Sequence, residues 1–447
     1  MASAAEQLAA SINFGAINKA TELKKRLWFT FGALIIYRLG TYIPLPGIDP
    51  VILEDIFQQQ AGGIIGMFNM FSGGALGRMT IFALGIMPYI SSSIIIQLMT
   101  TVSPHLAQLK KEGESGRKRI IQYTRYGTVI LATFQGMGMA VGLEGMTGSQ
   151  GSAVLDPGLT FRVPAVITLA GGTMFLMWLG EQITARGVGN GISLIIMAGI
   201  VAELPAAMAS TLELGRTGAL SALFIILLMV MSVAVIAFIV FIERAQRRLL
   251  VQYPKRQVGN RMFGGESTHL PLKLNTAGVI PPIFASSLLL LPITAMSFSA
   301  SAGPGWLGGV AAMLSRGSPG YLLLYIALIV FFAFFYTSVV FSPEDTADNL
   351  KKNNGFIPGI RPGKNTAEYI DHVLKRLTTV GAIYLSAVCV LPEILISQYA
   401  VPFYFGGTSL LIVVNVTMDF VAQIHSHLLA HQYEGLIKKS RLRGRRG

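Results

Sequence analysis

The sequence predicts an all-α membrane protein with ten transmembrane helices, and three observations lead to this fold class. Hydrophobic residues fill 52% of the 447 positions and charged residues only 13%, about half their share in ordinary soluble proteins. Ten stretches are long and apolar enough to cross a bilayer, which takes about 20 residues. The 35 basic residues, which outnumber the 22 acidic ones, are concentrated in every second connecting segment.

The same composition argues against other classes of protein. So much apolar surface does not fit into one water-soluble core, and disordered chains are poor in the Phe, Ile and Leu that abound here. Cys389 is the single cysteine. It therefore forms no intramolecular disulfide, and the ligand spacing of zinc fingers is missing.

The predicted spans follow one another along the whole chain. Two of them, 218–242 and 319–341, are the clearest because their apolar cores carry no charge, while 188–205 is short and rich in glycine. The ten spans lie near residues 27–45, 79–100, 121–142, 163–180, 188–205, 218–242, 276–296, 319–341, 377–396 and 405–427.

The distribution of basic residues predicts the orientation. Ten spans place both termini on one side, and the segments on that side hold 29 of the 35 Lys and Arg residues. Cytoplasmic loops of membrane proteins are enriched in basic residues, so both termini are expected in the cytoplasm. The predicted parts are a cytoplasmic N-terminus (1–26), an N-terminal half (27–205), a C-terminal half (206–427) with cytoplasmic loops 243–275 and 342–376, and a basic tail (428–447).

The two halves share a short motif. Gly85-Ile86-Met87-Pro88 in the second span matches Gly278-Val279-Ile280-Pro281 in the seventh at a constant offset of 193 residues, and serines follow in both. The two spans run in opposite directions, so the match predicts inverted repeats with a pathway between them. Pro88, Pro281 and Pro282 are expected to kink these helices. The alternative is a coincidence between two helices that contain proline.

Residues 61–76 form a glycine-flanked apolar segment that is too short to cross a bilayer. Segments of this length are typically re-entrant or interfacial. Composition alone leaves two interpretations open, a movable stopper that folds back into a cavity and an interfacial anchor.

No motif for enzymatic chemistry is present, because GESGRK at 113–118 and GVGNG at 187–191 lack the spacing of nucleotide-binding loops. We therefore expect neither catalysis nor a cofactor or metal. Asp419 is the only carboxylate predicted well inside a span. Intramembrane carboxylates often serve ion-coupled transport, so a secondary carrier of a small solute is the alternative function.

The two long cytoplasmic loops are basic and rich in turn residues. Loop 243–275 contains seven basic residues and Gly264-Gly265, which predicts a turn between two extended arms. Loop 342–376 contains GFIPGIRPG, whose prolines and glycines predict a rigid loop that projects Arg361. These loops favour docking of an RNA-rich or acidic partner, whereas simple contact with anionic lipids would need only clustered charge.

Several longer strings carry a resemblance to a known family. They are MFNMFSGGAL (67–76), IFALGIMPYIS (81–91), KKEGESGR (110–117), FLMWLGEQIT (175–184), RGVGNGIS (186–193), STHLPLK (267–273), TADNLKK (346–352), PGIRPG (358–363) and VPFYFGGTSLLIVV (401–414). With them the chain resembles the SecY/Sec61-alpha family, the central pore subunits of protein translocases, along essentially its whole length. The resemblance implies the bacterial plasma membrane and a function in passing unfolded secretory chains outward and releasing apolar helices sideways.

The resemblance also implies roles for individual residues. The pore would be closed by a plug near 62–75 and open sideways at a lateral gate between spans two/three and seven/eight, where Pro88, Pro281 and Pro282 lie. A ring of isoleucines would line the constriction: Ile86, Ile90, Ile192, Ile196, Ile283 and Ile412. Such side chains offer no hydrogen bond to a passing chain, and a narrow apolar throat resists wetting. The plug residues would be Ile64, Ile65, Met67, Phe68, Asn69, Met70 and Phe71.

Partners follow from the resemblance in the same way. The implied docking residues for the ribosome or the motor ATPase SecA are Arg244, Arg247, Arg248, Lys255, Arg256 and Arg361. The implied associates are the small subunits SecE and SecG, signal peptides and nascent chains, YidC, and anionic lipids.

Overall fold

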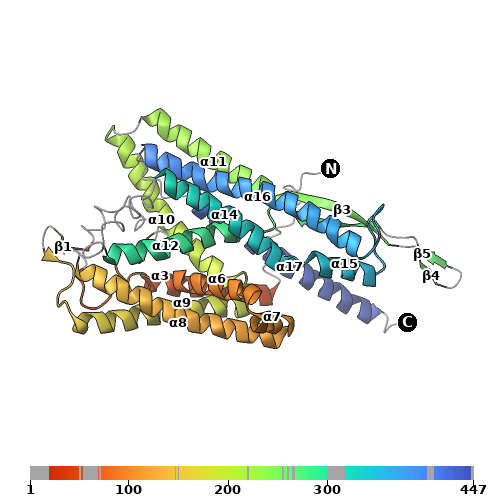
Figure 1. Cartoon of the computed structure of the whole chain (residues 1–447), viewed down its shortest axis with the longest axis horizontal. Coiled ribbons are helices and arrows are strands. Elements are labelled where there is room, and N and C mark those ends of the chain that lie inside the picture. The colour runs from red at the N-terminus through yellow and green to blue at the C-terminus, as the bar shows by residue number, and fades with distance from the viewer. Residues whose placement is uncertain are drawn as a thin grey trace. The chain divides into compact units, whose positions relative to one another are not determined.

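The computed structural model describes residues 20–49, 52–53, 69, 72–145, 147–148, 151–218, 221–253, 256–258, 261–263, 267–299, 318–399 and 407–443 (Figure 1). Most of these residues are helical. The helices are α3 (Thr21–Gly40), α6 (Met87–Val102), α7 (Pro104–Lys111), α8 (Glu114–Glu144), α9 (Leu159–Arg186), α10 (Gly191–Arg216), α11 (Ala222–Arg244), α12 (Ile280–Ser299), α14 (Pro319–Val340), α15 (Pro343–Lys352), α16 (Lys364–Tyr399) and α17 (Gly407–Arg443). The strands are β1 (Thr147–Gly148), β2 (Gly151–Ser152), β3 (Gln246–Gln252), β4 (Arg256–Val258), β5 (Arg261–Phe263) and β6 (Ser267–Lys273).

Each predicted span overlaps one of these helices. Among the described residues, seven helices are long and apolar enough to cross a membrane: α8, α9, α10, α11, α14, α16 and α17. The apolar helices of the second and seventh spans, Met87–Val102 and Ile280–Leu289, are shorter. Helix α3 has 20 residues, but its first turns carry charged residues.

Helix α11 shows why a bilayer is the environment. Its apolar side chains point outward along its whole length, with Leu223 78% exposed near the start and Phe241 72% exposed near the end. Only 11% of its most apolar stretch is buried inside the chain. A helix that is apolar all round and unburied is stable in lipid and not in water. The chain is therefore a multi-pass membrane protein.

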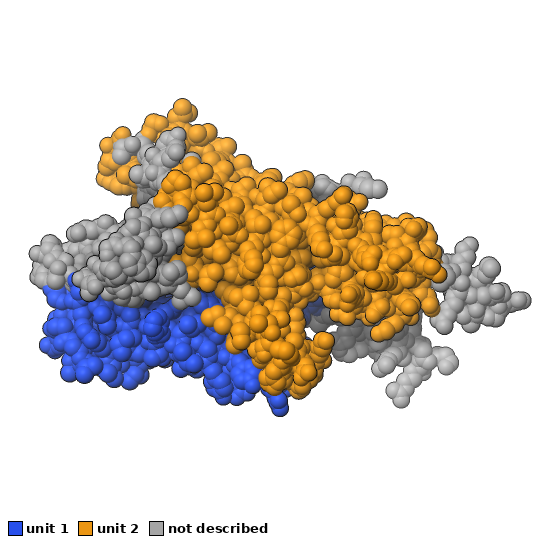
Figure 2. Space-filling model, viewed as in Figure 1, with its two compact units in different colours: residues 1–93, 118–208, 412–447 blue, residues 94–117, 209–411 orange. Residues whose placement is uncertain are grey.

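The described residues group into two compact units (Figure 2). Unit 1 comprises residues 1–93, 118–208 and 412–447, and unit 2 comprises residues 94–117 and 209–411. The units do not coincide with the predicted halves, because 94–117 groups with the second unit and 412–447 with the first. The inverted halves therefore stay a prediction.

In unit 1, two ion pairs join α8 to α9 at opposite ends. Arg125 Nη2 lies 2.6 Å from Glu181 Oε2, and Arg162 Nη2 lies 2.5 Å from Glu144 Oε2. The paired residues are 19 positions apart on each helix (125 to 144, and 162 to 181). At about 1.5 Å per residue the pairs are roughly 28 Å apart, close to the thickness of the hydrocarbon layer. Arg125 and Arg162 are thus both held by ion pairs between the two helices.

Helix α6 begins eight residues later than the predicted span. Residues 81–86 form turns, and Gly85, two residues before the helix, adopts a left-handed conformation with φ +56°. Pro88 then occupies the first turn, where its missing N–H removes no helical hydrogen bond. The proline starts this helix and does not kink it, which corrects the prediction.

The start of α12 in unit 2 repeats this local structure. Gly278 has φ +64°, and Pro281 and Pro282 follow in the first turn of the helix. They too begin a helix, so the predicted kinks are wrong at all three prolines. The equivalent glycines both have a positive φ and the equivalent prolines both lie in the first turn of a helix, which supports the sequence repeat at the level of the backbone.

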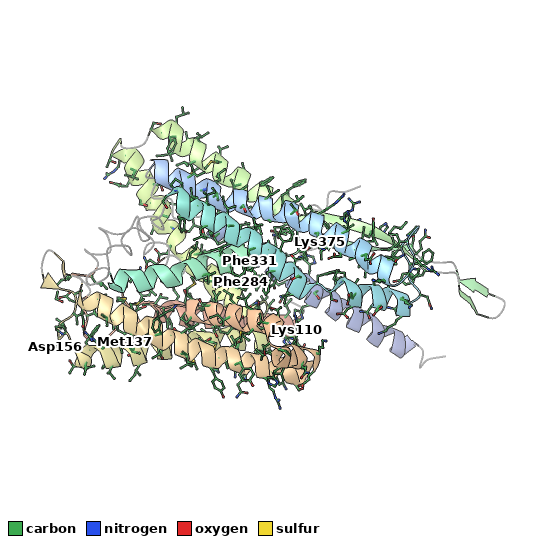
Figure 3. All side chains as sticks on the ribbon, viewed as in Figure 1. Lys110, Met137, Asp156, Phe284, Phe331 and Lys375 are labelled. Atoms are coloured by element: carbon green, nitrogen blue, oxygen red, sulfur yellow. The ribbon has the colours of Figure 1, made fainter. Side chains whose placement is uncertain are left out.

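Unit 2 is built on packed helices, with α14 between α12 and α16. Phe284 of α12, labelled in Figure 3, packs edge-on against Phe332 and Tyr336 of α14 at ring distances of 5.7 and 6.3 Å. At the C-terminal end of α14, Lys110 Nζ of α7 donates a hydrogen bond to the Val339 carbonyl at 3.1 Å (Figure 3). Cations near the last carbonyls stabilise a helix.

Candidate functional site

The predicted ring residues are mostly buried. Ile86, Ile90, Ile196 and Ile412 expose between 1% and 8% of their surface, and Ile192 and Ile283 are half-buried. Five belong to unit 1 and Ile283 to unit 2, so the ring stays a prediction. Ile192 and Ile196 share a face of α10, because they lie four residues apart in one helix.

Ile86 differs from the prediction, because it lies in the turn before α6 and not within a helix. Its carbonyl nevertheless accepts the amide of Ile90 at 3.1 Å. The two residues therefore remain one helical turn apart.

The first turn of α10, which carries Ile192, is fixed by its neighbours. Asn190 caps the helix, since its Oδ1 accepts the Ile192 amide at 3.1 Å and its carbonyl accepts the Leu194 amide at 3.0 Å. Gly180 of α9 lies so close that a Cβ there would be 2.9 Å from Ile192 Cγ1. Only glycine allows this approach of the two helices.

The loop before α10 is held by side chains from three helices. The Val188 amide donates to Thr30 of α3 at 3.1 Å, the Gly191 amide to Thr184 of α9 at 2.9 Å, and the Gly189 amide to Gln423 of α17 at 2.8 Å. Sequence reasoning found no role for this glycine-rich loop. These hydrogen bonds show that the loop connects α3, α9 and α17 within unit 1.

The position of Asp419 follows from the same loop. Asp419 is exposed and lies one turn before Gln423, whose partner Gly189 is in a connecting segment. Asp419 is about 6 Å along the helix from the level of that loop, and it lies near the middle of the apolar span Gly407–Leu429, as the sequence predicts.

Most of the predicted plug lies outside the described residues, namely Ile64, Ile65, Met67, Phe68, Met70 and Phe71. Asn69 is described, and its Oδ1 accepts the Gly77 amide at 2.6 Å. Its carbonyl accepts the Ser72 hydroxyl at 3.0 Å. Hydrogen bonds of Asn69 thus hold residues 72–77, at the C-terminal end of the predicted plug, in a compact set of turns.

Arg38 of α3 also binds these turns through its guanidinium group. Its Nη1 donates to the Gly73 carbonyl at 2.6 Å, and its Nη2 donates to the Tyr42 hydroxyl at 3.1 Å. Arg38 and Arg78 both lie against the Tyr42 ring, 5.0 and 4.5 Å from its centroid. Arg38 therefore connects α3 to the turns formed by residues 72–78.

The two long loops, 243–275 and 342–376, form one folded platform in unit 2. Strands β3 and β6 pair antiparallel from Gln246↔Lys273 to Gln252↔Ser267, which confirms two extended arms. On its other side, Gln252 exchanges two backbone hydrogen bonds with Phe356, at 2.9 and 3.0 Å. The hairpin and the second loop share one apolar core with α16, formed by Leu249, Val251, Leu272, Ile357, Ile370, Val373 and Leu377. We call this element the cytoplasmic platform, because the sequence predicts that both loops lie in the cytoplasm.

The far end of the hairpin differs from the expected turn. Strands β4 and β5 pair with Val258 opposite Arg261, so the chain reverses before Gly264-Gly265. Gly264, Gly265 and Lys255 lie outside the described residues, and Arg256 is described only as the first residue of β4.

The other predicted docking residues lie on the platform. Arg244 ends α11, Arg247 and Arg248 lie on β3, and all three side chains are exposed. Arg361 is exposed between Gly359 (φ +80°) and Gly363 (φ +104°), as the proline-glycine pattern predicts. Its carbonyl accepts the Thr366 hydroxyl at 3.0 Å, which fixes the loop against α16.

Within the described part of the chain, no group of three or more His, Cys, Asp or Glu side chains is placed to hold a metal ion. The notable features are instead long apolar helices, closely packed glycines and a basic folded platform. Together they define a polytopic helical membrane protein that carries a basic folded platform.

Comparison with known proteins identifies the family. A family model of SecY matches residues 80–421. The chain is 58% identical over 424 residues to the protein translocase subunit SecY of Escherichia coli strain K12, covering 95% of this chain and 96% of that protein. The chain belongs to the SecY family.

Solved structures share the fold. One solved structure is described as that of a protein conducting channel. It matches with a TM-score of 0.67 at 17% identity, and the match covers 91% of this chain and 92% of the chain in that structure. Sec61 in the canine ribosome-channel complex has a TM-score of 0.62 at 18% identity, with the same coverage. At these identities the likeness establishes the fold alone.

Proposed function

We propose that the chain is the pore-forming subunit of a protein-conducting channel in the bacterial plasma membrane, with both termini in the cytoplasm. It passes unfolded secretory chains across the membrane and releases apolar helices sideways into it. The observation that carries this proposal is the 58% identity to a protein translocase subunit over 95% of the chain. The 29 basic residues on the predicted cytoplasmic side support the orientation.

The ring and the plug belong to this proposal. Isoleucines 86, 90, 192, 196, 283 and 412 would seal the pore around a passing chain without holding it by hydrogen bonds. The hydrogen bonds of Arg38 and Asn69 support the plug assignment, because they fix residues 73 and 77 at the C-terminal end of the predicted plug, 62–75. The starts of α6 and α12 would border the lateral gate.

The cytoplasmic platform would dock the ribosome or the motor ATPase SecA. Its exposed arginines lie on a strand and a rigid loop that share one apolar core, so their spacing is preset. Arginine side chains that are already held in position lose little conformational entropy when they bind phosphate groups of a partner. SecE and SecG would accompany the chain as subunits, and the energy for transport would come from the docked partner.

A crosslinking experiment tests the proposal. A photoreactive side chain at Ile90 or Ile283 should crosslink to a stalled secretory chain in membranes that contain the full complex. The matched control is the same probe at Leu227, which is 61% exposed on α11 and should label lipid. Equal labelling of the secretory chain from Leu227 and from both isoleucines would refute a pore at these positions.

A further inference from the structure

A buried carboxylate lies where the cytoplasmic platform joins the membrane helices. Glu243 is in the last turn of α11 and is only 8% exposed. A negative charge at the C-terminal end of a helix is unfavourable, and a buried carboxylate requires hydrogen-bond donors. Asn275, 3% exposed, supplies one, since its Nδ2 donates to Glu243 Oε1 at 2.6 Å.

The same amide group holds the start of α12. Asn275 Nδ2 also donates to the Gly278 carbonyl at 3.1 Å, so both of its hydrogens are used. Gly278, with φ +64°, lies two residues before α12 begins. One side chain therefore connects the end of α11 to the turn from which α12 starts.

The pair also continues the hairpin of the platform into the membrane helices. Gln246 of β3 lies opposite Lys273 of β6, and the Leu274 amide then donates to the Ala245 carbonyl at 3.0 Å. The Glu243–Asn275 hydrogen bond is the next connection along the same two chain segments. The pairing thus passes without a break from the platform to the ends of α11 and α12.

Neighbouring helices constrain this junction. A Cβ at Gly381 of α16 would be 3.2 Å from the Leu274 carbonyl, so α16 supports the junction from one side. Further along α12, Phe284 packs against Phe332 and Tyr336 of α14. A displacement of the α12 start would therefore be carried into the α12–α14 pair and would not be absorbed locally.

We propose that Glu243 and Asn275 are positioning residues that couple docking on the cytoplasmic platform to movement of α12. When a partner tilts the hairpin, the carboxylate–amide hydrogen bond pulls on the Gly278 turn and so on the helix that follows. This inference rests on the proposed function. It adds a mechanical connection that acts after the partner has bound.

The test separates partner binding from transport. Asn275→Ala in the full complex, reconstituted in vesicles, removes both hydrogen bonds. We expect partner affinity within about twofold of wild type and partner-driven transport of a secretory chain reduced about tenfold, which corresponds to roughly 1.4 kcal/mol. Glu243→Gln keeps an acceptor oxygen for Asn275 and should retain most of the transport. Thr276→Ala, next to Asn275, is the matched control and should behave as wild type.

Other results would overturn the inference. Wild-type transport by Asn275→Ala would show that the pair carries no movement, and a parallel loss of binding and transport would show that it only folds the platform. If Asn275→Ala fails to accumulate, Asn275→Leu, which is close in size and donates no hydrogen bond, replaces it, and its binding and transport are interpreted in the same way. Failure of the wild-type complex itself to transport would count against the proposed function and not against the coupling.

Discussion

Charge reversal at Arg361 is the sharpest test of the docking platform. Arg361 is exposed, and neither a hydrogen bond nor an ion pair of its guanidinium is found among the described residues. Arg361→Glu should therefore change the free energy of unfolding by less than about 0.5 kcal/mol. Loss of one charge-assisted hydrogen bond to a partner should weaken binding by about 2 kcal/mol, or roughly 30-fold.

The salt dependence of binding gives a second readout. If Arg361 contacts a phosphate, the slope of log affinity against log salt should fall by about 0.7 to 0.9 in the variant. The assay is a titration of ribosomes or of the motor ATPase onto the complex in nanodiscs at several salt concentrations. Thermal unfolding of the same sample checks the fold.

Lys364→Glu is the matched control for Arg361→Glu. Lys364 is also exposed, begins α16 three residues later, and undergoes the same change of charge. Glutamate is favourable in the first turn of a helix, so the fold should be unaffected. Binding should weaken far less than for Arg361→Glu. Equal losses in both variants would mean that only the overall charge matters and would refute a specific contact.

Four further predictions concern the membrane part. Arg162→Ala leaves the Glu144 carboxylate without its ion pair and should lower the thermal unfolding temperature; unchanged thermal unfolding would contradict this. Gly172→Leu should destabilise further, because even a Cβ would collide with the Ile81 carbonyl, and normal accumulation would argue against that close packing. Deletion of residues 65–70 should raise ion leakage in planar bilayers, and background conductance would argue against a stopper. Asp419→Asn should leave export intact, whereas loss of transport would favour an ion-coupled carrier.

The sequence predicted those parts of the fold that hydropathy and local chain chemistry determine. The apolar run of α11 and the two extended arms of the hairpin were predictable, because each depends on neighbouring residues. The sequence predicts kinks at Pro88 and Pro281, but both residues lie in the first turn of a helix. A proline kinks a helix only from its interior, whereas a proline that follows a left-handed glycine can begin one.

Long-range contacts were beyond the sequence. The backbone pairing of Gln252 with Phe356 joins two loops about a hundred residues apart, and no local pattern marks it. The alternation of Leu249 and Val251 in a polar loop was the one available signal, because buried residues there require a partner surface. Likewise the pairing of Arg125 with Glu181 depends on the way α8 and α9 align, which hydropathy does not determine.

That alignment has a mechanical consequence. Because ion pairs join α8 and α9 at both ends, a shift of one helix past the other by a turn, about 5.4 Å, would break both pairs at once. The two helices therefore keep a fixed register and behave as one rigid pair that spans the membrane. In a thinner bilayer such a rigid pair tilts as a whole, because its helices do not slide past each other. Unit 1 would therefore respond to membrane thickness by changing the tilt of α8 and α9 relative to the membrane normal.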